Sequence, residues 1–209
     1  MAAPGPKFLW NGPEESRLTV ALAHGAGAAM DAAFMAAFAQ GLADHGLRVA
    51  RFEFPYMRAR RADGGRRPPD RAPVLIACWH EVIAALGDPS RLVIGGKSMG
   101  GRIASLIADE AEVAGLVCLG HPFHPPGRPE KTRTAHLAAL TTPTLIVQGE
   151  RDALGNAADL AGYSLSPAIR LHWCADGDHG FKPRKVSGHT EAGNWTTAIA
   201  AITEFIAGL

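Results

Sequence analysis

The chain has 209 residues and a formal net charge of +1, with 47% hydrophobic and 20% charged residues. This length suits one compact domain, and the composition is typical of a globular protein rather than a disordered one. A chain so close to neutral lacks the overall field that would attract nucleic acid or an anionic membrane. We therefore expect a single domain over residues 1–209 that binds neither of them.

The cysteines and the first residues favour a cytoplasmic location. Cys78, Cys118 and Cys174 lie in separate apolar runs without metal-ligand spacing, so buried and reduced thiols are expected. The first twelve residues contain two prolines and no apolar stretch of the kind found in signal peptides. No apolar run in the chain is long enough to cross a bilayer.

Short apolar runs alternate with alanine-rich stretches along the chain. Strands are expected near residues 8–10 and over residues 18–23, 47–54, 91–95, 113–119, 143–147 and 169–174. Helices are expected over residues 32–43, 73–86 and 196–206 and directly after residue 101. Because parallel strands need crossover connections, this alternation predicts an α/β fold: a mostly parallel sheet of six or seven strands with helices on both faces.

Residues 96–100 read Gly-Lys-Ser-Met-Gly and stand between an expected strand and an expected helix. A nucleophile elbow needs this context, because its sharp turn lifts the serine hydroxyl above the sheet edge and leaves no room for side chains at the flanking glycines. Ser98 is thus the candidate nucleophile. The amide of Met99, at the start of the helix, is a candidate oxyanion donor. The plain alternative is a glycine-rich turn with an inert serine.

Two nucleotide-binding interpretations of the glycines fail on spacing. A phosphate-binding loop ending at Ser98 would need glycine at position 91, where the chain has Arg91. A dinucleotide fingerprint starting at Gly25 would need a small residue at position 30, where the chain has Met30. We therefore expect no nucleotide cofactor, and no other cofactor is indicated.

An acid and a histidine follow later in the chain, in the order that this type of elbow requires. Asp152 comes just after the strand expected at residues 143–147, and His179 lies in a glycine-flanked loop after the strand at 169–174. Because parallel strands end at one edge of a sheet, both residues are predicted to meet Ser98, with His179 as base and Asp152 fixing its tautomer. Other nearby residues remain alternative acids or an alternative base: Glu150, Asp176, Asp178 and His189.

The turn at residues 24–27, His-Gly-Ala-Gly, follows the strand at 18–23 and fits the second half of an oxyanion hole. The amide of Ala26 is the favoured donor, and that of Gly27 is the alternative. His24 and Gly27 are also candidate pocket residues. A glycine-rich turn with only a structural role is the alternative for this segment.

His121 and His124 follow the strand at residues 113–119 and are further candidate pocket residues. A metal site is not expected there, because no carboxylate or further ligand has suitable spacing. The arginine-rich segment over residues 58–71 is interpreted as a solvated surface loop. Attraction of an anionic substrate is its alternative role.

The chain resembles the α/β-hydrolase superfamily, and within it the small dienelactone-hydrolase-like members of the KANL/Tex-like group. The matching segments are LAHGAGAAMD (22–31), RFEFPYM (51–57), GGKSMGGR (95–102), HPFHPPGRPE (121–130), QGERDALG (148–155) and DGDHGF (176–181). The resemblance implies Ser98, Asp152 and His179 as a triad, with the amides of Ala26 and Met99 as oxyanion donors. Larger members insert a cap after the fourth strand, where this chain has only about 20 residues, so an open pocket without a cap is expected.

These residues predict a serine hydrolase that acts on a small-molecule acyl substrate, an ester, a thioester or a related compound, through an acyl-enzyme on Ser98. A catalytically silent binding or scaffold protein with the same fold is the second interpretation. Acyl transfer or haloperoxidase-like chemistry on the same triad is the third.

Overall fold

Seven strands form one sheet in the order β1-β3-β2-β4-β5-β6-β7 in the computed structural model, which describes residues 5–209. The strands are β1 (Leu9–Asn11), β2 (Thr19–Ala23), β3 (Arg48–Phe52), β4 (Leu92–Lys97), β5 (Gly115–Leu119), β6 (Thr144–Gly149) and β7 (Ile169–Cys174). Only β1 runs antiparallel to its neighbour, β3, and all the other pairs are parallel. The predicted α/β fold with a mostly parallel sheet is confirmed.

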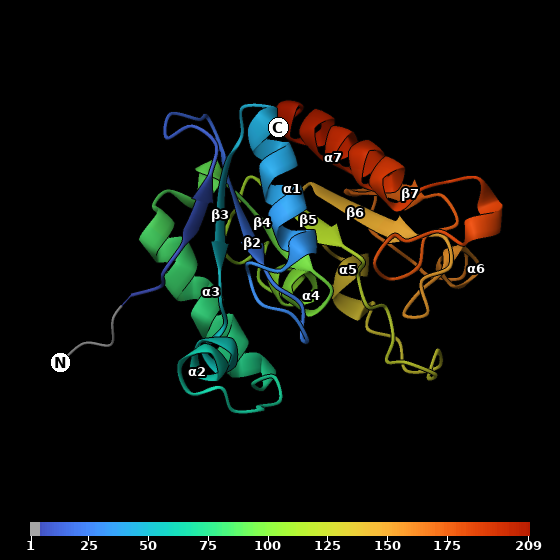
Figure 1. The fold of residues 1–209 in the computed structure, drawn as a ribbon, viewed down its shortest axis with the longest axis horizontal. Helices are drawn as coiled ribbons and strands as arrows, with labels where there is room; N and C mark the ends of the chain where they lie inside the picture. The colour runs from blue at the N-terminus through green and yellow to red at the C-terminus, as the bar shows by residue number, and fades with distance from the viewer. Residues whose placement is uncertain (1–4) are drawn as a thin grey trace.

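Helices cover both faces of this sheet (Figure 1). On one face lie α1 (Ala33–Asp44) and α7 (Glu191–Ala207), and on the other lie α3 (Ala72–Leu86) and α4 (Met99–Ser105). The shorter helical segments are α2 (Pro55–Asp63), α5 (Ala135–Ala138), α6 (Ala157–Leu160) and the 3₁₀ turns Pro89–Arg91 and Lys185–Ser187. Between β5 and β6 the chain forms only α5 and irregular structure, so the described residues contain no large cap.

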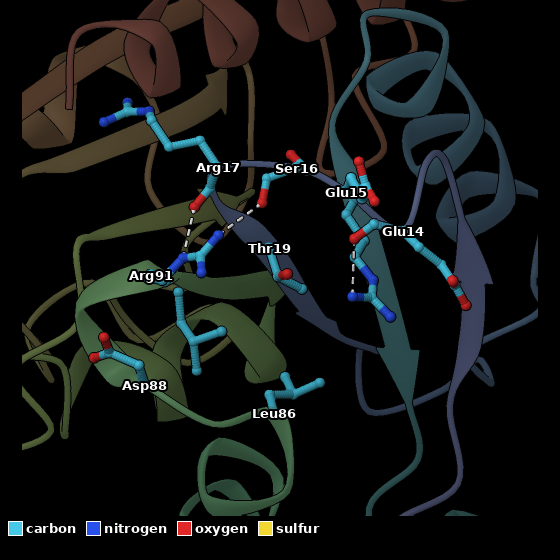
Figure 2. Close-up of a pocket in the computed structure, with 10 residues that line it drawn as sticks. Glu14, Glu15, Ser16, Arg17, Thr19, Leu86, Asp88 and Arg91 are labelled. Atoms are coloured by element: carbon cyan, nitrogen blue, oxygen red, sulfur yellow. Dashed lines mark hydrogen bonds between the residues drawn. The ribbon is translucent and has the colours of Figure 1, made fainter.

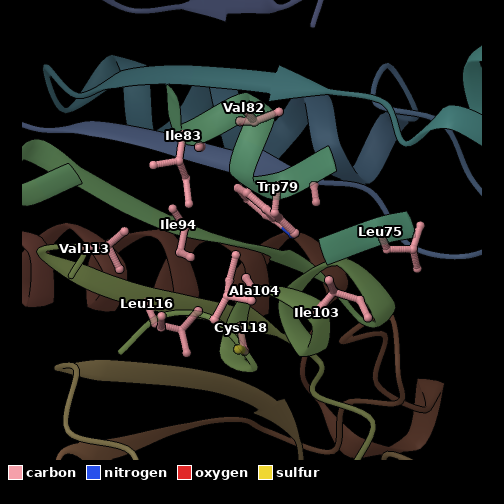
Figure 3. Close-up of a cluster of buried hydrophobic side chains, with 14 of the residues drawn as sticks. Leu75, Trp79, Val82, Ile83, Ile94, Ile103, Ala104, Val113, Leu116 and Cys118 are labelled. Carbon is pink, nitrogen blue, oxygen red and sulfur yellow. The ribbon is translucent and has the colours of Figure 1, made fainter. Parts of the chain in front are cut away.

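Each face of the sheet has its own apolar core. On the α3 and α4 side, Trp79 is fully buried (Figure 3). It packs edge-to-face on Phe52, with 4.7 Å between the ring centroids. On the α1 and α7 side, Phe38 and Phe181 are fully buried. Successive strand residues alternate between the two cores, which explains why the strands read as continuous apolar runs.

Two elements differ from the sequence-based expectation. The loop expected over residues 58–71 is wrong for residues 58–63, which belong to α2; Pro55 starts this helix, and Gly64 ends it in a left-handed conformation. Helix α7 begins at Glu191 instead of residue 196, because the Thr190 side chain caps it by accepting a hydrogen bond from the Gly193 amide at 3.0 Å.

The three cysteines are buried and free, as expected. Burial raises the pKa of the Cys118 thiol to about 12. None of the helices described over residues 5–209 combines the length and the apolar character needed to cross a bilayer.

The chain changes direction across the sheet at β2. From β2 it passes through α1 to β3 on one side, and it then returns through α2 and α3 to β4 on the other side. In open parallel sheets this reversal opens a crevice at the carboxyl ends of the two strands that flank it. The loop after β2 and the turn after β4 therefore face each other at this point.

Candidate active site

Ser98 sits in a strained turn between β4 and α4. Its backbone has φ +51° and ψ −113°, values that residues other than glycine rarely adopt. The Ser98 amide donates a hydrogen bond to the Leu119 carbonyl oxygen at 2.9 Å, and the Ser98 carbonyl accepts one from the Arg102 amide at 2.9 Å. The neighbouring strand β5 and the following helix α4 thus hold the turn from both sides.

Two glycines let the end of β2 pack directly against this turn. Gly96 has φ +144°, and a Cβ atom there would collide with the Ala23 carbonyl oxygen. A Cβ atom on Gly100 would come within 2.5 Å of the same oxygen. Close backbone approach therefore requires both glycines, and the dihedral angle is a second requirement at Gly96.

His179 connects Ser98 to Asp152. Its Nε2 atom lies 2.9 Å from the Ser98 Oγ atom, and its Nδ1 atom lies 2.7 Å from Asp152 Oδ2. Asp152 is fully buried, whereas the His179 side chain is one-third exposed. The structure thus brings together the three residues that the sequence predicts, although the chain separates Ser98 and His179 by 81 positions.

The Asp152 carboxylate has further donors. Gln148 Nε2 donates to Oδ2 at 3.0 Å, and the Leu154 amide donates to Oδ1 at 2.8 Å. Since the carboxylate accepts from all its partners, His179 Nδ1 carries the proton and Nε2 is free to accept from the Ser98 hydroxyl. Gln148 was not anticipated from the sequence; its place four residues before Asp152, at the end of a strand, was the available signal.

The other candidate acids and the other candidate base have different partners. Arg184 pairs with Asp176 and lowers the pKa of that carboxyl to about 2. Asp178 accepts hydrogen bonds from amides of its own turn, and Glu150 accepts one from the Asp176 amide. His189 is exposed in the loop before α7. None of these four hydrogen-bonds to Ser98 or His179 in the described structure.

His24 supports the loop after β2 from below. Its Nδ1 atom donates to the Gly25 carbonyl oxygen at 2.7 Å, and its Nε2 atom accepts from the Phe54 amide at 3.1 Å. Burial lowers its pKa, which favours the neutral ring that this arrangement needs. The expectation that His24 lines the pocket is wrong, because the ring is fully buried beneath the loop. Gly27 does line the cavity.

Tyr56 holds the same loop from α2. Its hydroxyl donates to the carbonyl oxygens of Ala26 at 3.0 Å and Gly25 at 3.3 Å. Burial raises the pKa of Tyr56 to about 12, so the hydroxyl stays protonated and remains a donor. No sequence pattern predicts this role, because it depends on α2 folding under the loop.

Ala26 and Met99 both border the space beside the Ser98 side chain. The Met99 amide is the first of α4, a position where a helix offers no acceptor of its own. The two residues thus flank Ser98 from the β2 loop and from the helix start, as the oxyanion-hole hypothesis requires.

Lys97 ties the His179 loop to the sheet. Its Nζ atom donates to the His179 carbonyl oxygen and lies 5.1 Å and 5.2 Å from the ring centroids of Phe34 and Phe181. Burial lowers the pKa of Lys97 to about 8, although the charge of Asp152 opposes this shift. Lys97 is the third unanticipated residue of the site, after Gln148 and Tyr56, despite its position next to Ser98 in the sequence.

His121 and His124 do not line the cavities beside Ser98, contrary to expectation. The chain turns inward after β5, so His121 is fully buried and His124 nearly so. His124 contacts the Pro125 carbonyl oxygen at 2.9 Å and Asp159 at 3.4 Å. Among residues 5–209, no group of three histidine, cysteine or carboxylate side chains is placed to hold a metal ion.

Two cavities open beside Ser98. The larger cavity, about 590 Å³, is bordered by residues that include Ala26, Gly27, Phe34, Ser98, His179 and Trp195. The smaller cavity, about 310 Å³, is bordered by residues that include Ala26, Asp70, Ser98, Met99, Arg102 and Arg133. From the arginine-rich segment 58–71, only Asp70 borders either cavity.

A third cavity of about 500 Å³ lies at the opposite edge of the sheet, beside the first residues of β2 and β4 (Figure 2). Arg91 there donates to the carbonyl oxygens of Ser16 and Arg17, both at 3.2 Å, and Arg48 donates to that of Glu14. These arginines hold the segment before β2 in place. The cavity lies away from the carboxyl ends of the strands and is not part of the candidate site.

Gly96→Ala should lower the free energy of unfolding by about 2–4 kcal/mol, because the new methyl group collides with β2 backbone and strains the turn. Gly162→Ala is the matched control, since its Cβ atom would have its nearest neighbour at an ordinary 3.5 Å. Denaturant unfolding of both variants measures the difference. Equal stability of the two variants would show that the contact at Gly96 is easily relieved.

Lys97→Met should reveal the lowered pKa of Lys97 through the pH dependence of stability. The unfolded lysine keeps its proton up to about pH 10.5 and the folded one only up to about pH 8. Between these values the unfolded state binds more protons, so the stability of the wild type relative to Lys97→Met should rise with pH. Unfolding at pH 7, 8.5 and 10 measures this difference, with the exposed Lys131→Met as control. A pH-independent difference would contradict the shift.

A family model described as an alpha/beta hydrolase domain matches residues 16–207. A search of curated proteins found no match. Among solved structures, an alpha-beta serine hydrolase homologue from Coxiella burnetii is 18% identical with a TM-score of 0.72, covering 98% of this chain and 94% of that one.

Two further structures have the same fold. Dienelactone hydrolase from Anabaena variabilis is 19% identical with a TM-score of 0.69, covering 98% of this chain and 99% of that one. A serine hydrolase without a lid from Xanthomonas campestris is 16% identical with a TM-score of 0.67, covering 100% and 96%. Since the family match spans nearly the whole sequence, the chain belongs to the alpha/beta hydrolase domain family.

Proposed function

We propose that this protein is a serine hydrolase that cleaves a carboxylic ester, thioester or related acyl bond through an acyl-enzyme on Ser98. The observation that carries the proposal is the hydrogen-bonded triad of Ser98, His179 and the buried Asp152. His179 lies 2.9 Å from the Ser98 Oγ atom and 2.7 Å from the Asp152 Oδ2 atom. Nucleophile, base and orienting acid in this order form the arrangement used for acyl transfer.

In the first half of the reaction, Ser98 Oγ attacks the acyl carbon and His179 Nε2 takes the hydroxyl proton. The amides of Ala26 and Met99 stabilise the negative charge that develops on the acyl oxygen. His179 then gives its proton to the leaving oxygen or sulfur as the bond to the acyl carbon breaks. Asp152 balances the positive charge on the ring while the proton resides there.

In the second half, a water molecule gives a proton to His179 and its oxygen attacks the acyl-enzyme. The bond between the acyl carbon and Ser98 Oγ breaks, His179 returns the proton to the serine, and a carboxylic acid leaves. Every proton in this cycle is moved by His179.

A silent scaffold with the same fold is the less favoured interpretation. In a scaffold protein that has lost the activity, the serine and the histidine are expected to lie apart, or the site is expected to be filled by side chains. Here the two side chains are in hydrogen-bonding contact, and two cavities adjoin the serine. This arrangement supports the enzyme.

Ser98→Ala should abolish labelling by a fluorophosphonate probe and lower kcat for 4-nitrophenyl acetate at least about 1,000-fold, because no other group supplies the nucleophile.

Asp152→Asn should keep the serine but lower kcat to a similar extent, because an amide favours the wrong tautomer of His179. Gel fluorescence and absorbance assays measure the two effects.

Ser105→Ala is the matched control. Ser105 Oγ also contacts a histidine, His136 Nε2, at 2.8 Å, but the serine is buried within α4 and has no strained backbone. This variant should label like the wild type. Labelling of Ser98→Ala at the wild-type level would refute the proposed nucleophile.

A further inference from the structure

The smaller cavity beside Ser98 has two arginines in its wall, Arg102 and Arg133. Arg102 follows Ser98 by four residues on α4, about one helical turn or 5.4 Å along the axis. Arg133 comes from the irregular segment between β5 and α5, where its amide bonds to the Phe123 carbonyl oxygen. Two separate elements thus bring guanidinium groups to one cavity next to the nucleophile.

Neither guanidinium has an ionic partner among the described residues. No carboxylate lies within 4.0 Å of either group, and the Arg102 Nε atom is buried without a hydrogen-bond partner. Burial and the nearby charge of Arg133 both lower the pKa of Arg102. Both side chains are partly buried. A partly buried cation without a partner costs free energy in a folded protein, and functional sites are where such a cost is tolerated.

The pKa values of two neighbouring histidines reflect the positive charge of this region. The pKa values of His121 and His136 are both lowered, first by burial and also by the charge of Arg102, so neither ring competes with the arginines for an anion. The one carboxylate that borders the cavity is Asp70, whose Oδ2 atom accepts the Tyr56 amide at 2.9 Å. Among the described residues, neither guanidinium group donates a hydrogen bond to Asp70 or to another residue, so both have donors free for a ligand.

The position of His179 indicates which part of a substrate the smaller cavity would hold. His179 borders the larger cavity and not the smaller one. Because His179 must give its proton to the leaving atom, the leaving group belongs on the side of the larger cavity. The acyl chain then extends into the smaller cavity, toward Arg102 and Arg133.

We propose that the acyl part of the substrate ends in a carboxylate held by Arg102 and Arg133, so that the substrate is a half-ester or half-thioester of a short dicarboxylic acid. This inference rests on the proposed hydrolase function. The planar guanidinium fork matches a carboxylate, and the one-turn separation from Ser98 suits an acyl chain of a few carbons. Hydrolysis adds water across the acyl bond and releases the dicarboxylic acid and an alcohol or thiol.

The test compares two 4-nitrophenyl esters that share a leaving group, the anionic mono-ester of glutaric acid and the neutral ester of pentanoic acid. The measured quantity is the ratio of kcat/KM for the anionic ester to that for the neutral ester. Arg133→Gln should lower this ratio about 10- to 100-fold, the range expected for hydrogen bonds to a charged group. The ratio is internal to each variant, so a loss of folded protein does not change it.

Two variants separate a specific site from general electrostatics. Arg128→Gln removes the same charge from an exposed position in the neighbouring loop and should leave the ratio within about twofold of the wild type. Arg133→Lys keeps the charge and should retain most of the ratio. An unchanged ratio in Arg133→Gln, or an equal fall in Arg128→Gln, overturns the carboxylate site.

A second substrate pair tests the assignment to the acyl side. In 3-acetoxybenzoate and phenyl acetate the charge difference lies in the leaving group, so Arg133→Gln should leave this ratio within about twofold of the wild type. If Arg133→Gln lowers this ratio and leaves the glutarate-to-pentanoate ratio unchanged, the acyl-side assignment is overturned. Failure of the hydrolase function looks different: the wild type would neither take up the fluorophosphonate nor hydrolyse the neutral pentanoate ester.

Discussion

The site depends on one constraint, the positive-φ backbone conformation of Ser98 between two glycines, Gly96 and Gly100, that pack against the Ala23 carbonyl oxygen. A relaxed turn would move the hydroxyl away from the edge of the sheet and away from His179. The conformation persists because Ser98 is fixed by the Leu119 carbonyl on one side and by the first turn of α4 on the other. Ile103 and Ala104 anchor α4 in the core on the α3 and α4 side, and this packing offsets the strain of the turn.

Sheet topology explains why so few residues are needed to complete the arrangement. The reversal at β2 opens the crevice between the β2 loop and the elbow, while β6 and β7 end at the same edge and deliver Asp152 and His179. Each loop is then fixed by side-chain hydrogen bonds. Tyr56 and His24 hold the β2 loop, Gln148 holds Asp152, and Lys97 holds the His179 loop.

The sequence was sufficient to predict the sheet, the elbow, and Asp152 and His179 beyond β6 and β7, because each depends on a local pattern: apolar runs, glycine spacing or position after a strand. Prediction from the sequence failed where the result depends on the direction in which a segment folds. Arginine-rich composition hid α2, although Tyr56 and Met57 are buried in the core. The three loop histidines looked alike in the sequence, yet His24 carries two hydrogen bonds under the β2 loop while His121 is buried without a partner for its ring nitrogens in the described residues. Such roles follow from tertiary packing.

The lack of a large cap in the described chain bears on how a substrate would be selected. A cap encloses a substrate and gains affinity from buried apolar area, whereas an open crevice must select its substrate with few contacts. Two guanidinium groups without an ionic partner among the described residues border the cavity beside the nucleophile, and that of Arg102 comes from about one helical turn along α4. They give an open site a strong and directional contact. The cost of leaving Arg102 without a partner in the free protein would then be recovered when the ligand binds, which is how a charged pocket rejects acyl chains that lack the matching charge. Selection by charge thereby replaces selection by enclosure, and it leaves the larger cavity on the His179 side open to varied leaving groups.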